Sequence, residues 1–239
     1  MYVVEDFIAQ GGGDIRALAI AGVGSSALGS AAFARNVAEA MKEPVAAVVS
    51  GYGLSDVMGE ALGGFFWFGA LNSLRHSFEG LDRATEMSPV HVPASIEATG
   101  QGLAHSSDVS GEALIRISRD TLTVASLLSD ERLRFAVLTG HSKGNLVLSE
   151  ALYHLVHLMP ARADALAASV HIITVSAVIA MPRHFSRVTD IIGGWDWFGR
   201  FNSRLDIKPD YVVQNAWHHT NTELYAHLPV AKTLREVLS

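Results

Sequence analysis

Short runs of apolar and β-branched residues alternate along the chain with longer stretches in which apolar residues recur every three or four positions. Runs of the first kind predict buried strands, and stretches of the second kind predict helices. The expected strands are residues 16–22, 45–50, 133–138 and 170–179, with two further candidates at 188–192 and 211–213. The expected helices are residues 26–41, 111–128, 145–158 and 230–238.

Strands that are separated by helices predict a mostly parallel sheet with helices on both faces. The expected fold class is therefore α/β, as a three-layer α/β/α sandwich that forms a single domain over residues 1–239. Residues 51–110 interrupt the alternation, because they are rich in Gly, His and aromatic residues and show no clear periodicity. A loop of that length in a compact domain is usually functional. We interpret residues 51–110 as an insertion that acts as a lid.

Four consecutive aromatic residues lie inside this insertion, at Phe65, Phe66, Trp67 and Phe68. They are compatible with a core segment, with an apolar lid over an acyl pocket, or with a surface that docks on lipid or on a hydrophobic granule. Their place in a non-periodic insertion favours the lid, and an apolar lid predicts an apolar ester as the substrate. The same stretch would also suit a homodimer interface.

Composition narrows the functional classes. Only 18% of the residues are charged and 49% are hydrophobic, which is typical of a well-filled core and not of a disordered chain. The net charge of −6 argues against a nucleic-acid partner, because phosphate binding needs a basic face. The absence of cysteine excludes disulfides and cysteine nucleophiles. The first residues lack the pattern of a signal peptide and no apolar run reaches the ~20 residues of a membrane span, so we expect a cytoplasmic protein.

The clearest chemical motif is Gly140-His141-Ser142-Lys143-Gly144, which has the form G-x-S-x-G. It stands between an expected strand and an expected helix, which is the setting of a nucleophile elbow. Such a turn would present the Ser142 hydroxyl at the carboxyl edge of the sheet. It would also place the backbone N–H of Lys143 at a helix N-terminus, where it can stabilise an oxyanion. The alternative is an ordinary tight turn between a strand and a helix.

A serine hydroxyl is a weak nucleophile without a base. When a serine stands in such an elbow, its acid and its histidine follow later in the chain, in that order. Two candidate acids follow the strand at 170–179, Asp190 and Asp196, and two adjacent candidate bases follow them, His218 and His219.

The stretch VLTGHSKGNLVLSEAL resembles the α/β-hydrolase superfamily, and within it the lipase class 3-like branch. The resemblance covers residues 133 to about 225 and implies an α/β-hydrolase fold with a Ser-His-Asp triad. Only about fifteen residues precede the first expected strand, so the fold would be shortened at its N-terminus.

The resemblance also selects among the candidates. The acid of this family ends a strand and is followed by an apolar turn, which favours Asp196 and leaves Asp190 as the second choice. The histidine of the family lies in an H-S-S-P-E-like turn. The chain has His-Thr-Asn-Thr-Glu from His219, so His219 is preferred to His218, although the proline of that turn is missing.

A second oxyanion donor is implied in the loop after the first expected strand, at Val23, Gly24 or Ser25. The same loop, residues 22–27, also fits the G-x-G-x-x-A pattern of dinucleotide sites. The next strand does not end in the acidic residue that would bind a ribose, so no nucleotide cofactor is expected.

The eleven histidines do not form a metal-binding pattern. His154 and His157 are three residues apart, but the E-x-x-H pattern of hydrolytic zinc sites is absent, so no metal is expected.

Together, the motif and the resemblance imply a serine hydrolase that needs no cofactor and cleaves a carboxylic ester through an acyl-enzyme. A lipase, an esterase or a depolymerase of an intracellular polyester would all fit, each acting on an apolar ester or lipid substrate. The alternative is a non-catalytic protein of the same fold that binds lipid or the surface of a granule.

Overall fold

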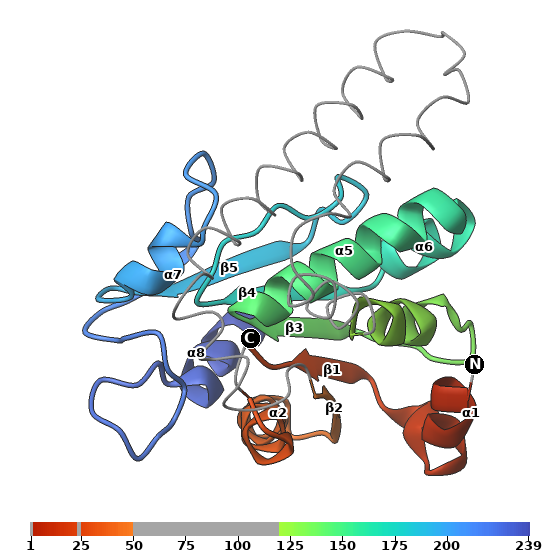
Figure 1. The fold of residues 1–239 in the computed structure, drawn as a ribbon, viewed down its shortest axis with the longest axis horizontal. Helices are drawn as coiled ribbons and strands as arrows, with labels where there is room; N and C mark the ends of the chain where they lie inside the picture. The colour runs from red at the N-terminus through yellow and green to blue at the C-terminus, as the bar shows by residue number, and fades with distance from the viewer. Residues whose placement is uncertain (1, 23–24, 50–119) are drawn as a thin grey trace, which may run out of the picture.

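A parallel sheet of six strands forms the centre of the computed structural model, which describes residues 2–22, 25–49 and 120–239 (Figure 1). The strand order is β2-β1-β3-β4-β5-β6, and every neighbouring pair is parallel. The strands are β1 (Ala17–Ile20), β2 (Val45–Val48), β3 (Val137–His141), β4 (His171–Val175), β5 (Val188–Gly193) and β6 (Tyr211–Val213).

Helices connect the strands and cover both faces of the sheet. They are α1 (Tyr2–Ala9), the short 3-10 helix η1 (Gly12–Asp14), α2 (Ala27–Met41), α5 (Lys143–Leu158), α6 (Pro160–Ala167), α7 (Trp197–Phe201) and α8 (Val230–Leu238), and residues 120–129 are also helical. Figure 1 shows α2 and α8 on one side of β1 and β3, and α5 and α6 on the other. The expected α/β class with a parallel sheet is confirmed, and the arrangement is compatible with a sandwich of three layers.

The core has two halves, because side chains alternate between the faces of a strand. Leu18 and Ile20 of β1 pack with α1, α5, α6 and the helix 120–129. Ala17 and Ala19 of the same strand pack with α2 and α8 on the opposite face. The sheet is thus apolar on both faces, as expected for parallel strands covered by helices.

Two expected strands are placed differently in the structure. The strand expected at 133–138 is β3 (Val137–His141), because pairing with β1 begins only at Val137. The strand expected at 170–179 ends at Val175, because Ser176 has a positive φ of 60° and turns the chain. Residues 176–179 remain buried, so their hydrophobicity reflects the core and not a strand.

Three further helices, α1, α6 and α7, were not expected from the pattern. The helix expected at 111–128 is described only from residue 120, where the chain is helical. The insertion expected at 51–110, with the aromatic residues Phe65, Phe66, Trp67 and Phe68, lies outside the described residues. No helix among the described residues is long and apolar enough to cross a membrane.

Arg162 of α6 stabilises the segment that connects the helix at residues 120–129 to β3. Its Nε donates to the carbonyl of Leu128 (2.9 Å), and its Nη2 donates to the carbonyls of Asp130 (3.0 Å) and Leu133 (2.8 Å). One guanidinium therefore joins α6 to the end of the helix at residues 120–129 and to the segment that leads into β3.

We expect Arg162→Met to lower the free energy of unfolding by about 2–4 kcal/mol, because three carbonyl groups lose a charged donor. Arg162→Lys should lower the free energy of unfolding by less, since the ammonium group keeps the charge but lacks the several donors of the guanidinium group. Chemical denaturation measures both effects. Arg187→Met, at an exposed arginine, is the control and should change the stability little. An Arg162→Met variant as stable as that control would contradict this role.

Candidate active site

Ser142 lies in the sharp turn between β3 and α5 and has an unusual backbone conformation. Its φ is 54° and its ψ is −121°, a region that residues other than glycine rarely adopt. The turn is held by hydrogen bonds at both ends. The Ser142 N–H donates to the carbonyl of Val175 at 2.8 Å, and the Asn145 N–H donates to the carbonyl of Ser142 at 3.0 Å.

The glycines on either side of Ser142 are needed for space. A Cβ at Gly144 would overlap the carbonyl oxygen of Ile20 in β1, and a Cβ at Gly140 would overlap the side chain of Asn145. The Asn145 amide in turn donates to the carbonyls of Val175 and Ala177, at 3.0 and 2.9 Å. The G-x-S-x-G motif is therefore required by the way that α5 starts against β1 and β4.

His218 joins the serine to a carboxylate. Its Nε2 lies 3.0 Å from the Ser142 Oγ, and its Nδ1 lies 3.0 Å from both carboxylate oxygens of Asp196. A carboxylate accepts hydrogen bonds, so the Nδ1 of His218 donates and its Nε2 is left to accept the proton of the serine hydroxyl. The edge of the Phe198 ring packs against the His218 ring, with centroids 4.9 Å apart.

Asp196 follows β5 and begins α7. Its side chain is fully buried, and its Oδ1 accepts a hydrogen bond of 2.6 Å from the backbone N–H of Gly199, as the N-cap of α7. A Cβ at Gly199 would overlap both the carboxylate and the carbonyl of Ser176. The cap fixes the direction of the carboxylate toward His218.

Of the two adjacent histidines, the geometry selects His218, the second choice of the sequence analysis. His219, the first choice, has no hydrogen bond to Ser142 or Asp196. Its buried Nδ1 has no partner among the described residues, while its carbonyl accepts from the Leu228 N–H at 2.8 Å. Both histidines follow β6 in a segment without regular structure. The spacing of a turn cannot decide which of two neighbouring side chains faces the sheet edge.

Asp190, the second choice of acid, lies inside the sheet and has no hydrogen bond to His218 or His219. It stands opposite Thr174 in the pairing of β4 with β5, and the Thr174 hydroxyl donates to its carboxylate. Burial, opposed in part by that hydrogen bond, raises the pKa of Asp190 to about 6, and the nearby Asp210 also raises it. A carboxyl that keeps its proton in the folded state up to that pH makes the protein less stable as it ionises.

We expect the contribution of Asp190 to the free energy of unfolding to fall between about pH 4 and pH 6, because the folded state binds the proton of Asp190 more tightly than the unfolded state does. The loss from this one group is at most about 3 kcal/mol. Asp190→Asn should remove most of this fall and be more stable than the wild type at pH 7. Urea denaturation at pH 4.5 and pH 7 measures it, and Asp164→Asn, at an exposed position on α6, is the control. If the difference in free energy of unfolding between the wild type and Asp190→Asn is the same at pH 4.5 and at pH 7, this prediction is wrong.

The expected oxyanion donors are placed only in part. Lys143 is the first residue of α5, so its backbone N–H lies at a helix N-terminus, which favours a negative charge. Gly22, two residues after β1, lies against the serine, because a Cβ there would be 3.0 Å from the Cβ of Ser142. Val23 and Gly24 lie outside the described residues. The N–H of Ser25 donates to the carbonyl of Gly22 at 3.3 Å and is used in the turn.

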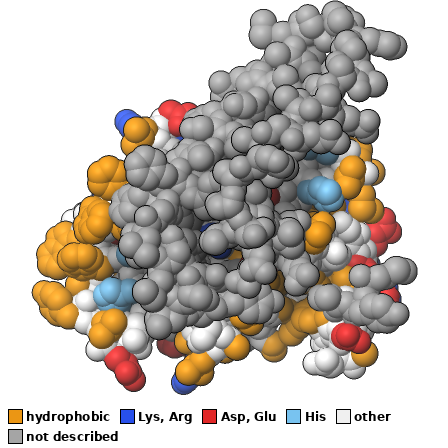
Figure 2. All heavy atoms as spheres, viewed as in Figure 1, with side chains coloured by type: hydrophobic (Ala, Val, Ile, Leu, Met, Phe, Trp, Pro, Cys, Tyr) orange, Lys and Arg blue, Asp and Glu red, His pale blue; other side chains and the backbone are white. Residues whose placement is uncertain are grey.

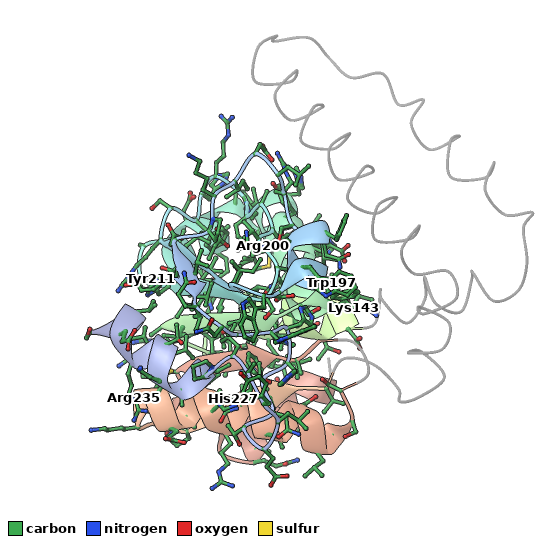
Figure 3. All side chains as sticks on the ribbon, turned by 90° about the vertical axis from the view of Figure 1, so that its left-hand side faces the viewer. Lys143, Trp197, Arg200, Tyr211, His227 and Arg235 are labelled. Carbon is green, nitrogen blue, oxygen red and sulfur yellow. The ribbon has the colours of Figure 1, made fainter. Side chains whose placement is uncertain are left out.

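No group of three or more His, Asp or Glu side chains suited to a metal ion occurs in the described part of the chain. Figure 3 shows Lys143 and Trp197 on the same side of the molecule; they begin the helices that follow Ser142 and Asp196.

A comparison of the chain with models of protein families, with curated proteins and with solved structures found no match to any of them. The chemical interpretation of the site therefore depends on its geometry.

Proposed function

We propose that this chain is a serine hydrolase that cleaves a carboxylic ester, with Ser142 as the nucleophile, His218 as the base and Asp196 as the acid. The observation that carries the proposal is the unbroken series of hydrogen bonds from the Ser142 Oγ through the His218 ring to the Asp196 carboxylate. The strained backbone of Ser142 and the chain order Ser, Asp, His support an α/β-hydrolase type of fold.

In the first step, the Ser142 Oγ attacks the carbonyl carbon of the ester while His218 Nε2 takes the serine proton. Asp196 stabilises the imidazolium ion that forms. The carbonyl oxygen becomes an oxyanion near the backbone N–H of Lys143. The C–O bond to the alcohol then breaks, and His218 returns the proton to the leaving oxygen. A water molecule then attacks the acyl-enzyme, with His218 again accepting the proton and returning it to the Ser142 Oγ, and the carboxylic acid is released.

The first test is reaction with a fluorophosphonate probe, which labels an activated serine. Wild type should carry one adduct on Ser142, found by peptide mapping, and Ser142→Ala should carry none. Removal of the base should lower the labelling rate by about 10³-fold or more. His218→Ala is therefore compared with His219→Ala, a matched change at the neighbouring residue.

His219→Ala should label at close to the wild-type rate. If folded wild-type protein carries no adduct in buffer or in detergent, the proposed hydrolase is wrong. If His219→Ala loses more than His218→Ala, the assignment of the base is wrong.

A second function is favoured by exposed aromatic side chains beside the site. Trp195, Trp197, Phe201 and Trp217, which we call the aromatic rim, have exposed fractions from 42% to 77%. Figure 2 shows hydrophobic side chains gathered on the side of the molecule where Figure 1 places α7. Trp197 directly follows Asp196 and Trp217 directly precedes His218. The Trp195 N–H donates to the carbonyl of Ala216 at 3.0 Å and joins the two segments.

Exposed aromatic side chains in one patch commonly mark a binding surface. Under this second hypothesis, the chain binds the surface of a lipid or polyester particle through the rim, with or without cleavage. The two functions are compatible if the substrate is an apolar ester, since binding through the rim would bring the surface of the ester particle close to Ser142.

Sedimentation with vesicles of uncharged phospholipid and with polyester particles tests the rim. Wild type and Ser142→Ala should sediment equally, because binding does not need the nucleophile. Trp197→Ser with Phe201→Ser should reduce the bound fraction by about tenfold or more, because about 1.5–3 kcal/mol is gained when one large apolar side chain is buried. Leu158→Ser, at an exposed leucine that ends α5, is the matched control and should bind as the wild type does. Equal binding by all variants would exclude the rim.

A further inference from the structure

His141, the residue before Ser142, is not part of the proposed triad, but its ring contacts the proposed base. The centroid of its ring lies 5.2 Å from that of His218, with the ring planes tilted by 49°. The same ring also contacts Phe33 in α2, with the ring centroids 5.7 Å apart. The His141 ring is thus held between a core side chain and the proposed base.

A hydrogen bond joins His141 to the backbone of His218. The Nε2 of His141 lies 2.9 Å from the carbonyl oxygen of His218. A carbonyl oxygen can only accept, so this Nε2 carries a proton. Burial, with the nearby His218, lowers the pKa of His141 to about 4, so the ring is neutral near pH 7 and has a single N–H. That single proton is therefore fixed on the nitrogen that faces His218.

A second donor reaches the same carbonyl. The Ser176 Oγ donates to the carbonyl oxygen of His218 at 3.2 Å. Ser176 follows β4, and His141 ends β3. His218 itself lies in a segment between β6 and α8 that has no helix or strand. The main chain of His218 is thus hydrogen-bonded to the ends of β3, which leads into Ser142, and of the neighbouring strand β4.

We propose that His141 is a positioning residue: its Nε2–H holds the backbone of His218, and so keeps the His218 ring between Ser142 and Asp196. This inference deepens the proposed function and rests on it. A small displacement of a base can cost much of the rate, because proton transfer needs a short and aligned hydrogen bond. A neutral neighbour also suits the site, since a charged one would oppose the imidazolium that forms on His218.

The first experiment compares fluorophosphonate labelling rates. His141→Phe keeps a ring but removes the donor, and should lower the rate by about 10- to 100-fold. His141→Gln returns an N–H near the position of Nε2 and should recover most of that loss. His171→Phe is the matched control, because His171 is a buried histidine that is hydrogen-bonded to Thr189 in the neighbouring strand, and it should label as the wild type does.

Turnover of p-nitrophenyl esters separates positioning from packing. His141→Phe should lower kcat and leave KM within about threefold, because a displaced base slows proton transfer and not the binding of the substrate. Ser176→Ala should have a smaller effect alone and a larger one when combined with His141→Phe, since the two donors share one acceptor. Equal kcat in wild type and folded His141→Phe, or no recovery in His141→Gln, would overturn the proposal.

Nitrogen-15 NMR of the histidine rings tests the inference without any turnover. Between pH 5 and pH 8, wild type should show His141 as a neutral ring protonated on Nε2. The low-field proton of His218 Nδ1, which reports its hydrogen bond to Asp196, should be lost in His141→Phe and kept in His141→Gln. If wild type is not labelled but shows these signals, the proposed function fails and the positioning holds. A His141 ring protonated on Nδ1, or a His218 signal unchanged in His141→Phe, would refute the positioning.

Discussion

The backbone conformation of Ser142 is the constraint on which the candidate site depends. A φ of 54° at a residue with a side chain persists only when its surroundings hold it. Here β4 holds it through the carbonyl of Val175, and α5 holds it through the N–H of Asn145. Gly144 lets α5 start directly against β1. Two strands and the helix that packs on them thus support the strained turn, and the same turn presents the hydroxyl to His218.

The partners of Ser142 meet it because the strands are parallel. Successive parallel strands end at one edge of the sheet, so segments far apart in the chain arrive at the same place. Asp196 follows β5, and its direction is set by the cap of α7. His218 follows β6, and its carbonyl accepts hydrogen bonds from residues at the ends of β3 and β4. The proposed acid is thus fixed by local structure, whereas the proposed base is fixed by tertiary contacts.

The contrast between Asp190 and Asp196 shows how position in one strand sets the chemistry of a carboxyl. Asp190 lies within the β4–β5 pairing, where burial favours its protonated form and Thr174 is its partner. Asp196 lies just beyond the strand, with a backbone N–H and the His218 ring as donors. Only the second environment can stabilise a histidine cation. The preference for the acid at the strand end therefore has a physical basis in where the strand stops.

The sequence by itself determined the alternation of strands and helices, and with it the parallel sheet, because period and burial are properties of local pattern. It also determined the turn at Ser142, since two glycines and a following helix leave little choice of backbone. It did not determine where strands stop: residues 176–179 are as apolar as β4 but lie beyond the turn at Ser176. It could not choose between His218 and His219, nor show that His141 contacts the base. Neighbouring side chains in an irregular segment face different ways, and only the packing of that segment over the sheet edge decides which one meets the serine.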